Sequence, residues 1–271
     1  MDSVFIFSIR SVLILHLHTL ITEEKQGKSI YPTFLRTFSI EDLNALRYDR
    51  NMSLPLSLTV TFAQSLDGRI ATLSGQSQWI SGERTLRLAH KLRREHDSIL
   101  VGIGTVRKDD PELTCRLVRG TSPVRVVLDA GLTIPLESKL VKTAGVHPTI
   151  VLCSHEADNS REQRLQSLHV QVARIQDDGK GSLDVQEVLR VLVYRGLRSL
   201  LVEGGSRVIT SFLRAGLVDR LVVVTAPLII GEGVPCIGDL GVRELSEARR
   251  LRCVRVRRVG KDLVWELKCN G

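Results

Sequence analysis

The sequence predicts an α/β domain with a mainly parallel sheet flanked by helices. From Leu56 onward, short runs rich in β-branched residues alternate with longer amphipathic stretches, which is typical of strand–helix–strand units. Near the end of the chain, two runs with period-two alternation are separated only by Gly260 and Lys261, as in an antiparallel hairpin. The 271 residues are 43% hydrophobic, which is enough to bury a sizeable core.

Six apolar runs are the predicted strands of the sheet. Each is short, rich in valine, leucine or isoleucine, and bounded by polar or glycine-bearing segments. In chain order they are residues 58–64, 98–102, 124–129, 149–153, 199–203 and 221–226. The predicted C-terminal hairpin spans residues 251–267.

Three of the intervening stretches predict helices clearly. Residues 83–95 begin after Ser81 and Gly82, residues 184–195 follow a polar segment, and residues 206–215 end at Gly216. Glycine directly after the last periodic residue is a common helix terminator.

Residues 1–51 predict an N-terminal extension, and residues 52–271 the folded domain. The apolar stretch 4–21 suggests a membrane span or signal sequence, yet charged and histidine residues interrupt it and no small-residue cleavage site follows. Met52 stands directly before the first predicted strand. We expect an extension that adds nothing to the fold, with a targeting segment or a packing arm as alternatives.

Composition narrows the classes of partner. The net charge of +8 favours an anionic partner, which could be nucleic acid, a membrane surface or a phosphorylated small molecule. The five cysteines and seven histidines are scattered, so we expect neither a disulfide framework nor a metal site, and a cytoplasmic location. The arginines at 255, 257 and 258 predict a solvated strand face, because no aromatic residues interleave to stack bases.

Two strand-to-helix turns are the predicted ligand site. In parallel α/β sheets, ligands collect at the carboxyl ends of strands, where helix N-termini offer free N–H groups to phosphates. The turn in SILVGIGTV contains Gly104 and Thr105, and the turn in VEGGSRV contains Gly204 and Gly205. Neither carries a G-x-G-x-x-G fingerprint. Each glycine pair alone could serve packing, but together they favour a phosphorylated ligand.

Three further positions are candidates for ligand contact. Glu203 ends a strand next to two glycines, where it could accept hydrogen bonds from sugar hydroxyls, with a capping or salt-bridge role as the alternative. Trp79 lies in a polar loop, which favours a ligand-facing platform. Asp109 and Asp110 precede a proline, and by themselves they indicate a turn.

Six segments, taken together in order and spacing, resemble the reductases that act on diaminopyrimidine ribosylamine phosphates in riboflavin synthesis. The segments are TFAQSLDGRIAT, SGQSQWIS, HDSILVGIGTVRKDDPELTCR, PVRVVLD, LLVEGGSRV and GLVDRLVVVTAPLIIG. The resemblance covers residues 56–267. It implies a dihydrofolate-reductase-like three-layer sandwich, a homodimer, and NADPH-dependent reduction of a ribosylamino-pyrimidinone 5′-phosphate to its ribitylamino form.

The resemblance also implies the roles of individual residues. It places NADPH against Ala63, Trp79, Thr105, Asp109, Val127, Leu128, Asp129, Ala130, Gly205, Ser206, Arg207 and Val208. It places the substrate against Ser77, Arg93, Leu113, Arg116 and Glu203. Asp109 and Glu203 would be the catalytic residues, and hydride would reach C1 of a ring-opened imine without a side-chain nucleophile.

Arginine side chains suit the phosphate, because a guanidinium is permanently charged and can donate two parallel hydrogen bonds. Arg93 and Arg116 are therefore the expected phosphate ligands. Without the resemblance, Arg93 would be interpreted as part of a solvated face, since its predicted helix is rich in arginine.

The sequence departs from the family pattern in three respects. Many bacterial members carry an N-terminal zinc deaminase, whose H-x-E and P-C-x-x-C elements are missing here. They also have a lysine near the position of Thr61 and often a serine at that of Ala130. We expect a stand-alone reductase, with the amination state of its substrate left open. A reductase of another pterin-like or pyrimidine compound, and a basic nucleic-acid-binding protein, are the alternative functions.

Overall fold

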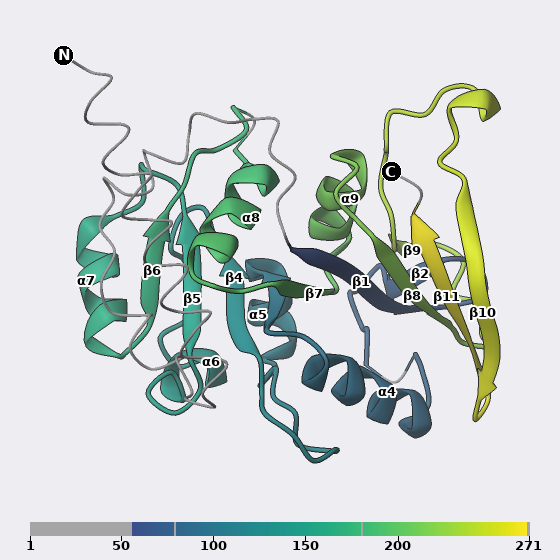
Figure 1. Cartoon of the computed structure of the whole chain (residues 1–271), viewed down its shortest axis with the longest axis horizontal. Helices are drawn as coiled ribbons and strands as arrows, with labels where there is room; N and C mark the ends of the chain where they lie inside the picture. The colour runs from purple at the N-terminus through teal and green to yellow at the C-terminus, as the bar shows by residue number, and fades with distance from the viewer. Residues whose placement is uncertain (1–55, 79, 180, 270–271) are drawn as a thin grey trace, which may run out of the picture. The chain divides into compact units, whose positions relative to one another are not determined.

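The described part of the chain, residues 56–78, 80–179 and 181–269 of a computed structural model, is organised around one large sheet (Figure 1). The inner strands are rich in valine, leucine and isoleucine and buried along most of their length, as expected where helices cover both faces of a parallel sheet. In chain order the strands are β1 (Ser57–Gln64), β3 (Ser98–Gly102), β4 (Val124–Leu128), β5 (Thr149–Cys153), β6 (Gln171–Arg174), β7 (Ser199–Glu203), β8 (Arg220–Thr225), β10 (Leu251–Val259) and β11 (Asp262–Cys269). Two more, β2 (Arg69–Thr72) and β9 (Gly233–Pro235), form a separate ribbon.

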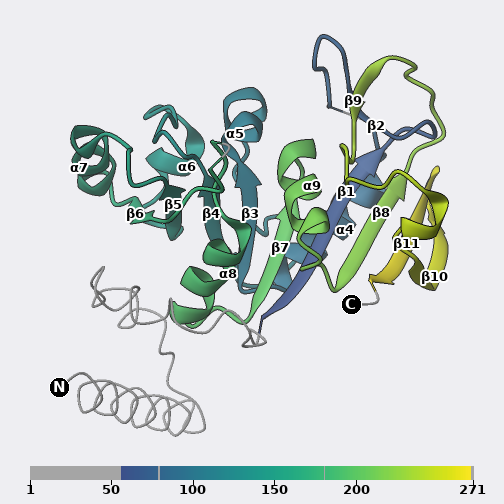
Figure 2. The same cartoon turned by 90° about the horizontal axis from the view of Figure 1, so that it is seen from above.

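Strand order places β1 between β7 and β8. Across the sheet the order is β10-β11-β8-β1-β7-β3-β4-β5-β6 (Figure 2). The strands from β8 to β6 pair in parallel, whereas β11 pairs antiparallel with both β8 and β10. The predicted mainly parallel sheet with an antiparallel C-terminal hairpin is confirmed.

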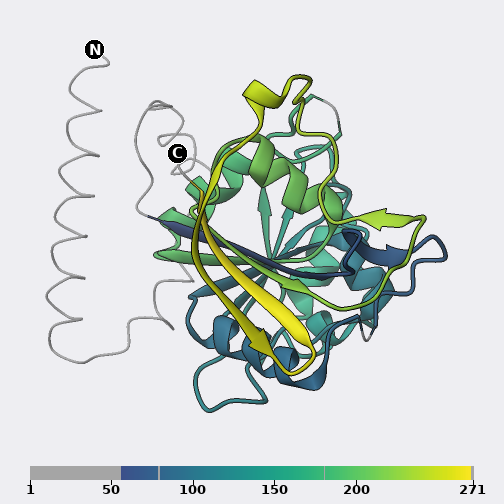
Figure 3. The same cartoon turned by 90° about the vertical axis from the view of Figure 1, so that its right-hand side faces the viewer.

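Helices lie on both faces of the sheet. They are α4 (Glu83–Arg94), α5 (Ile103–Asp109), α6 (Lys139–Lys142), α7 (Asn159–Ser167), α8 (Val185–Tyr194) and α9 (Ser206–Arg214), with a 3-10 turn at Leu245–Glu247. Each connection that contains α4, α5, α6 or α7 leads to a strand nearer the β6 edge of the sheet. The connections that contain α8 and α9 lead in the opposite direction, toward β8. Right-handed crossovers therefore place the two sets on opposite faces, and Figure 3 shows α9 and α4 on opposite sides of the sheet.

The predicted helices and strands agree with the structure apart from their end residues. Three strands match at both ends, and the predicted helix ends differ because each prediction included a cap. Asp184 is the N-cap of α8, where its side chain accepts a hydrogen bond from the Gln186 N–H. Glu95 and Ala215 are the C-caps of α4 and α9. Caps are half inside a helix, so periodicity alone does not separate them from it.

Several short elements were not predicted. The helix α7 buries only Leu165, so it lacks the apolar stripe from which a helix is recognised. The strands β2, β6 and β9 have three or four residues each, which is too short for a clear period. Asp67 accepts hydrogen bonds from the N–H groups of Ile230 and Gly231 and so ties the β1–β2 turn to the segment before β9.

The burial pattern of β10 differs from the predicted alternation. Every residue from Leu251 to Val256 is exposed, the apolar ones included. The reason is position, because β10 is the edge strand of the sheet and pairs only with β11. Arg255 and Arg258 are exposed as predicted, while Arg257 is half-buried and forms an ion pair with Glu266.

The predicted extension, residues 1–51, lies outside the described residues, and so does Trp79. In the part of the chain that is described, no helix has both the length and the apolar character needed to cross a membrane. The described residues belong to the unit Leu54–Gly271.

Candidate functional site

The two predicted strand-to-helix turns lie side by side. A Cβ placed on Gly102, where β3 meets α5, would lie 2.8 Å from Val208 Cγ2 in the first turn of α9. A Cβ placed on Gly205 would lie 3.4 Å from Thr105 Oγ1 in α5. The close approach of α5 and α9 therefore requires a glycine at Gly102, whereas at Gly205 a Cβ would make an ordinary contact. Gly104, in the first turn of α5, has no neighbour within 4 Å of the Cβ position.

The start of α9 offers free backbone donors. The first backbone hydrogen bond of this helix runs from the Ile209 N–H to the Gly205 carbonyl. The N–H groups of Ser206, Arg207 and Val208 therefore make no hydrogen bond within the helix. Gly204 and Gly205 have φ of +78° and +82°, a conformation that glycine adopts at little cost. The local geometry is that of an anion-binding turn.

If this turn binds the NADPH that the family resemblance implies, replacing Gly205 with alanine is expected to weaken NADPH binding about 10-fold, and to cost about 1 kcal/mol of folding free energy through left-handed strain. Relief of that strain would shift the backbone and with it the N–H donors at the start of α9. Gly216→Ala is the matched control, since Gly216 has φ +72° at the other end of α9. Titration of NADPH followed by fluorescence, together with urea unfolding, measures both effects. Equal NADPH affinity in the two variants would contradict the assignment.

Around the α5 end of the site, Ser77 and Asp109 contact each other. The Ser77 hydroxyl donates to Asp109 Oδ1 at 3.1 Å, which joins the loop after β2 to the last residue of α5. Asp110 then takes a left-handed conformation with φ 37° and ends the helix. The Asp-Asp-Pro segment, predicted as a simple turn, is instead the C-terminal end of α5, and this end places Asp109 beside Ser77.

At the end of β4, the Asp129 carboxylate is occupied by hydrogen bonds within the protein. Asp129 is 1% exposed, and its two oxygens accept hydrogen bonds from the Thr133 hydroxyl at 2.7 Å and the Ile134 N–H at 2.6 Å. Val127 is buried in the core, whereas Leu128 and Ala130 are half-buried. The Asp129 side chain therefore stabilises the turn that follows β4.

At the carboxyl end of β1, Ala63 is half-buried and pairs with Val224 of β8. Thr61 is buried, and its hydroxyl donates to the Val222 carbonyl at 2.9 Å. Its side chain therefore stabilises the pairing of β1 with β8.

Arg93 and Glu203 form a largely buried, two-pronged ion pair. Arg93 Nε donates to Glu203 Oε1 at 2.9 Å and Nη2 donates to Oε2 at 2.6 Å, and the two side chains are only 11% and 14% exposed. Burial alone lowers the pKa of Arg93, but the neighbouring Glu203 carboxylate outweighs it and raises the pKa. The solvated-face interpretation of Arg93 is wrong, because α4 turns this arginine toward the end of β7. The salt-bridge alternative for Glu203 is observed.

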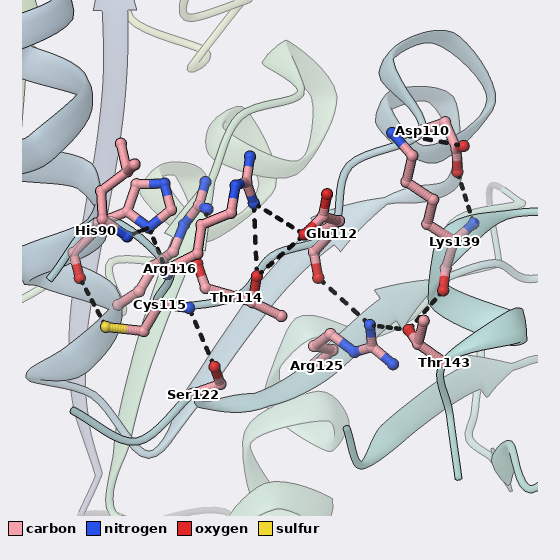
Figure 4. A network of polar contacts seen from close by, with 12 residues as sticks. His90, Asp110, Glu112, Thr114, Cys115, Arg116, Ser122, Arg125, Lys139 and Thr143 are labelled. Carbon is pink, nitrogen blue, oxygen red and sulfur yellow. Dashed lines mark hydrogen bonds and ion pairs between the residues drawn. The ribbon is translucent and has the colours of Figure 1, made fainter. Parts of the chain in front are cut away.

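The segment from Glu112 to Leu117, part of which Figure 4 shows, contacts this pair through Arg93. Arg93 Nη1 donates to the Thr114 carbonyl at 3.2 Å. Leu113 has φ 54°, is 2% exposed and belongs to the core, so its side chain does not reach a ligand. Arg116 is exposed, with Nη1 at 3.3 Å from Glu112 Oε2, and its guanidinium remains available to an anion.

His90 is a functional candidate that the sequence analysis missed. It is 0% exposed, and its Nδ1 accepts hydrogen bonds from the backbone N–H groups of Arg116 at 3.1 Å and Leu117 at 3.4 Å. The Cys115 thiol donates to the His90 carbonyl. His90 stands three residues before Arg93 on one helix face, which is the spacing that could have pointed to it.

Acidification is expected to destabilise the protein through His90. Burial, reinforced by Arg93 and Arg116 and opposed by Glu203 and Glu112, lowers the pKa of His90 to about 4. Between the ordinary pKa of about 6.5 and this value, the unfolded chain holds a proton that the folded chain lacks, so stability falls as pH drops, by about 2 kcal/mol. Urea unfolding between these pH values measures the slope. His90→Asn, which keeps an acceptor but does not titrate, should flatten it, and the exposed His155→Asn should not; equal slopes in both would rule this out.

The structure thus brings predicted residues together in three groups. Thr105, Gly205 and Val208 meet where the two turns touch, Ser77 meets Asp109, and Arg93 meets Glu203 with the Thr114 carbonyl. Within the described ranges, no group of three histidine, cysteine, aspartate or glutamate side chains is arranged to hold a metal ion. The turns and Arg116 could bind anions, and the carboxylates of Asp109 and Glu203 could accept hydrogen bonds from a ligand.

Known proteins share this arrangement of segments. Residues 57–265 match the family model described as the RibD C-terminal domain. The riboflavin biosynthesis protein RibD of Aquifex aeolicus is 43% identical over 208 residues, which cover 76% of this chain and 56% of that protein. The 2,5-diamino-6-ribosylamino-4(3H)-pyrimidinone 5′-phosphate reductase of Methanothermobacter thermautotrophicus is 37% identical over 214 residues, covering 77% of this chain and 96% of that protein.

A solved structure agrees. The diaminohydroxyphosphoribosylaminopyrimidine deaminase/5-amino-6-(5-phosphoribosylamino)uracil reductase of Thermotoga maritima superposes with a TM-score of 0.66 at 31% identity, over 79% of this chain and 57% of that one. The chain therefore spans little more than half the length of the Aquifex and Thermotoga proteins. From its fold, its paired turns and these matches, the chain belongs to the RibD C-terminal domain family.

Proposed function

We propose that this protein uses NADPH to reduce the ribosylamino group of a pyrimidinone 5′-phosphate to the ribitylamino group, as a step of riboflavin biosynthesis. The observation that carries the proposal is the meeting of the two strand-to-helix turns at Gly102 and Gly205 beside the Arg93–Glu203 pair. This arrangement combines free helix N–H donors with a carboxylate and two arginines. The relative from Methanothermobacter, which this chain covers almost fully, is named as the reductase of a ribosylamino-pyrimidinone 5′-phosphate.

The turns suit a dinucleotide phosphate. The N–H groups of Ser206, Arg207 and Val208 lie outside the helical ladder, and glycine at 204 and 205 lets a ligand approach the backbone closely. Thr105 adds a hydroxyl from the neighbouring helix, and the end of β4 from Val127 to Ala130 adds backbone groups. When bound, NADPH supplies the hydride. Ala63 and the Trp79 loop complete the proposed cofactor contacts.

The second half of the site suits a sugar phosphate. Arg116 offers an exposed guanidinium, and Arg93 keeps two N–H groups beyond those it donates to Glu203 and Thr114. We assign Ser77, which contacts Asp109, and Leu113, which precedes the Thr114 carbonyl bound by Arg93, to the same substrate site. A dianionic phosphate that meets two permanently charged donors is bound strongly.

Two carboxylates have separate roles, one toward the ribose hydroxyls and one toward the proton. Glu203 is held rigidly by Arg93, so it can accept hydrogen bonds from the ribose hydroxyls in one fixed orientation. Asp109 is oriented by the Ser77 hydroxyl and can direct a water that supplies the proton to the opening sugar. Neither residue forms a covalent bond with the substrate.

An assay of NADPH oxidation tests the proposal. The purified protein is mixed with NADPH and, in separate reactions, with the aminated and the deaminated ribosylamino-pyrimidinone phosphate, while the absorbance of reduced nicotinamide is followed. We expect oxidation with one of the two, which also identifies the amination state. No oxidation with either would refute it. Reduction of a phosphate-free pterin alone, or salt-dependent nucleic-acid binding without oxidation, would support the alternatives instead.

We also propose that the enzyme acts as a cytoplasmic homodimer. Val256, Leu263 and Trp265 form an exposed apolar patch on the hairpin, at 44%, 43% and 37% exposure, with Val256 directly opposite Trp265. Such patches are typical of association surfaces. The cysteines of the described part are free, as in a reducing compartment. Light scattering coupled to gel filtration tests the mass, and a monomer would refute the dimer.

A further inference from the structure

Arg125 is a buried cation that packing does not explain. It is the second residue of β4, between Val124 and Val126, and is 0% exposed. No carboxylate among the described residues lies within ion-pair distance of it. Instead it donates to the carbonyls of Glu112, Leu140 and His147 and to the hydroxyls of Thr143 and Thr149.

Burying a charge without a counter-ion is unfavourable, and an apolar residue would fill the same position more cheaply. Burial lowers the pKa of Arg125 to about 10, so the guanidinium is still charged at neutral pH. Four of its contacts only join β4 to the neighbouring α6 and β5 region. The fifth, from Nη1 to the Glu112 carbonyl at 3.3 Å, reaches the segment that carries Arg116.

Glu112 connects the two arginines (Figure 4). Its backbone carbonyl accepts from Arg125, while its carboxylate lies 3.3 Å from Arg116 Nη1 and accepts from the Thr114 hydroxyl. The other end of the segment is held by His90, which accepts the Arg116 N–H, and its middle by Arg93, which donates to the Thr114 carbonyl. The backbone around the exposed Arg116 is therefore fixed from the protein interior.

We propose that Arg125 is a positioning residue for phosphate recognition: it holds the Glu112 end of the segment so that Arg116 presents its guanidinium to the substrate phosphate. The proposal rests on the proposed function, in which Arg116 binds that phosphate. Arg125 does not touch the substrate. Its charge also adds to the positive potential beneath the segment, which favours a dianion.

Ribose 5-phosphate is a probe that separates this role from turnover. In isothermal titration with the purified protein, we expect Arg125→Lys to weaken ribose 5-phosphate binding about 10-fold, because lysine cannot span the Glu112 carbonyl and the α6 acceptors together. NADPH affinity should stay within about 2-fold of the wild type, since the turns at Gly102 and Gly205 are untouched. Arg125→Met should weaken the phosphate probe at least as much.

Arg174→Lys is the matched control for losing a largely buried arginine. Arg174 lies in β6 at the far edge of the sheet, is 12% exposed in its side chain, and donates to a backbone carbonyl as Arg125 does. It should lower the melting temperature without changing ribose 5-phosphate affinity. If Arg125→Met does not fold, the ribose 5-phosphate affinity of Arg125→Lys still tests the proposal.

Turnover gives a second readout. With the phosphorylated substrate, Arg125→Lys should raise KM about 10-fold and change kcat less than about 2-fold, whereas a purely structural loss would lower only the active fraction. Unchanged ribose 5-phosphate affinity in Arg125→Lys, or no binding of that probe by the wild type, would overturn the inference. Failure of the proposed function is a separate result, namely no NADPH oxidation by the wild type.

Discussion

Replacing Glu203 with glutamine is expected to lower kcat roughly 100-fold, because the amide no longer holds the ribose hydroxyls in the orientation that the reaction needs. The same change should reduce the free energy of unfolding by about 2 kcal/mol, because Arg93, which is 9% exposed, would lose its counter-charge while retaining a neutral hydrogen-bond partner. Steady-state NADPH oxidation and urea unfolding measure the two effects. NADPH affinity should change little, since the α9 donors are not involved.

The chain contains a matched control for this variant. Glu162 forms a similar pair with Arg174, with Oε2 at 2.7 Å from Nη2 and 2.8 Å from Nε, far from the site at the edge of the sheet. Glu162→Gln should lower stability comparably and leave kcat unchanged. If Glu203→Gln lost no more activity than Glu162→Gln, Glu203 would be a structural partner of Arg93 and nothing more.

Replacing Arg116 with glutamine is expected to raise KM about 30- to 100-fold with little change in kcat. A hydrogen bond between charged groups contributes about 1.5–3 kcal/mol, and about 1.4 kcal/mol is a tenfold change in affinity. The Arg116 side chain is 49% exposed, so its loss should cost little folding stability. Initial rates over a range of substrate concentrations, at saturating NADPH, give the two constants separately.

Arg119 is the control for net charge. It lies three residues further along the same segment and is exposed, so Arg119→Gln removes the same charge without removing the proposed phosphate ligand. It should raise KM less than about 2-fold, because exposed charges are screened by salt. A similar rise in both variants would mean that the surplus of positive charge, and not Arg116 itself, attracts the substrate.

The strands of the central sheet could be predicted from the sequence because apolar runs buried on both faces carry a strong signal. The ends of β3, β5 and β7 were predicted to the residue, and these strand ends place the two turns. The turns then followed from the rule that parallel strands present their carboxyl ends at one edge of the sheet.

What could not be predicted is which charged side chains turn inward. Arg93 lies in an arginine-rich helix, and only the position of β7 shows that one arginine of that helix faces Glu203. Arg125 interrupts an apolar strand, which indicates a buried charge. The strand pattern alone does not show which groups that charge contacts. Leu113 was expected to meet the substrate, but its left-handed backbone sends the side chain into the core. These orientations depend on contacts distant in sequence.

The position of β1 has a consequence for how the chain folds. β1 is the first strand of the described domain to be synthesised, yet its partners β7 and β8 begin at Ser199 and Arg220. The Thr61 hydroxyl and the Val222 carbonyl that it contacts are 161 residues apart, and Asp262 of the final hairpin accepts the N–H of Gly82, 180 residues earlier. Such long loops must close before these pairings stabilise the sheet, which makes folding slow. During translation β1 therefore waits with both edges unpaired, and this is when the nascent chain is most exposed to aggregation.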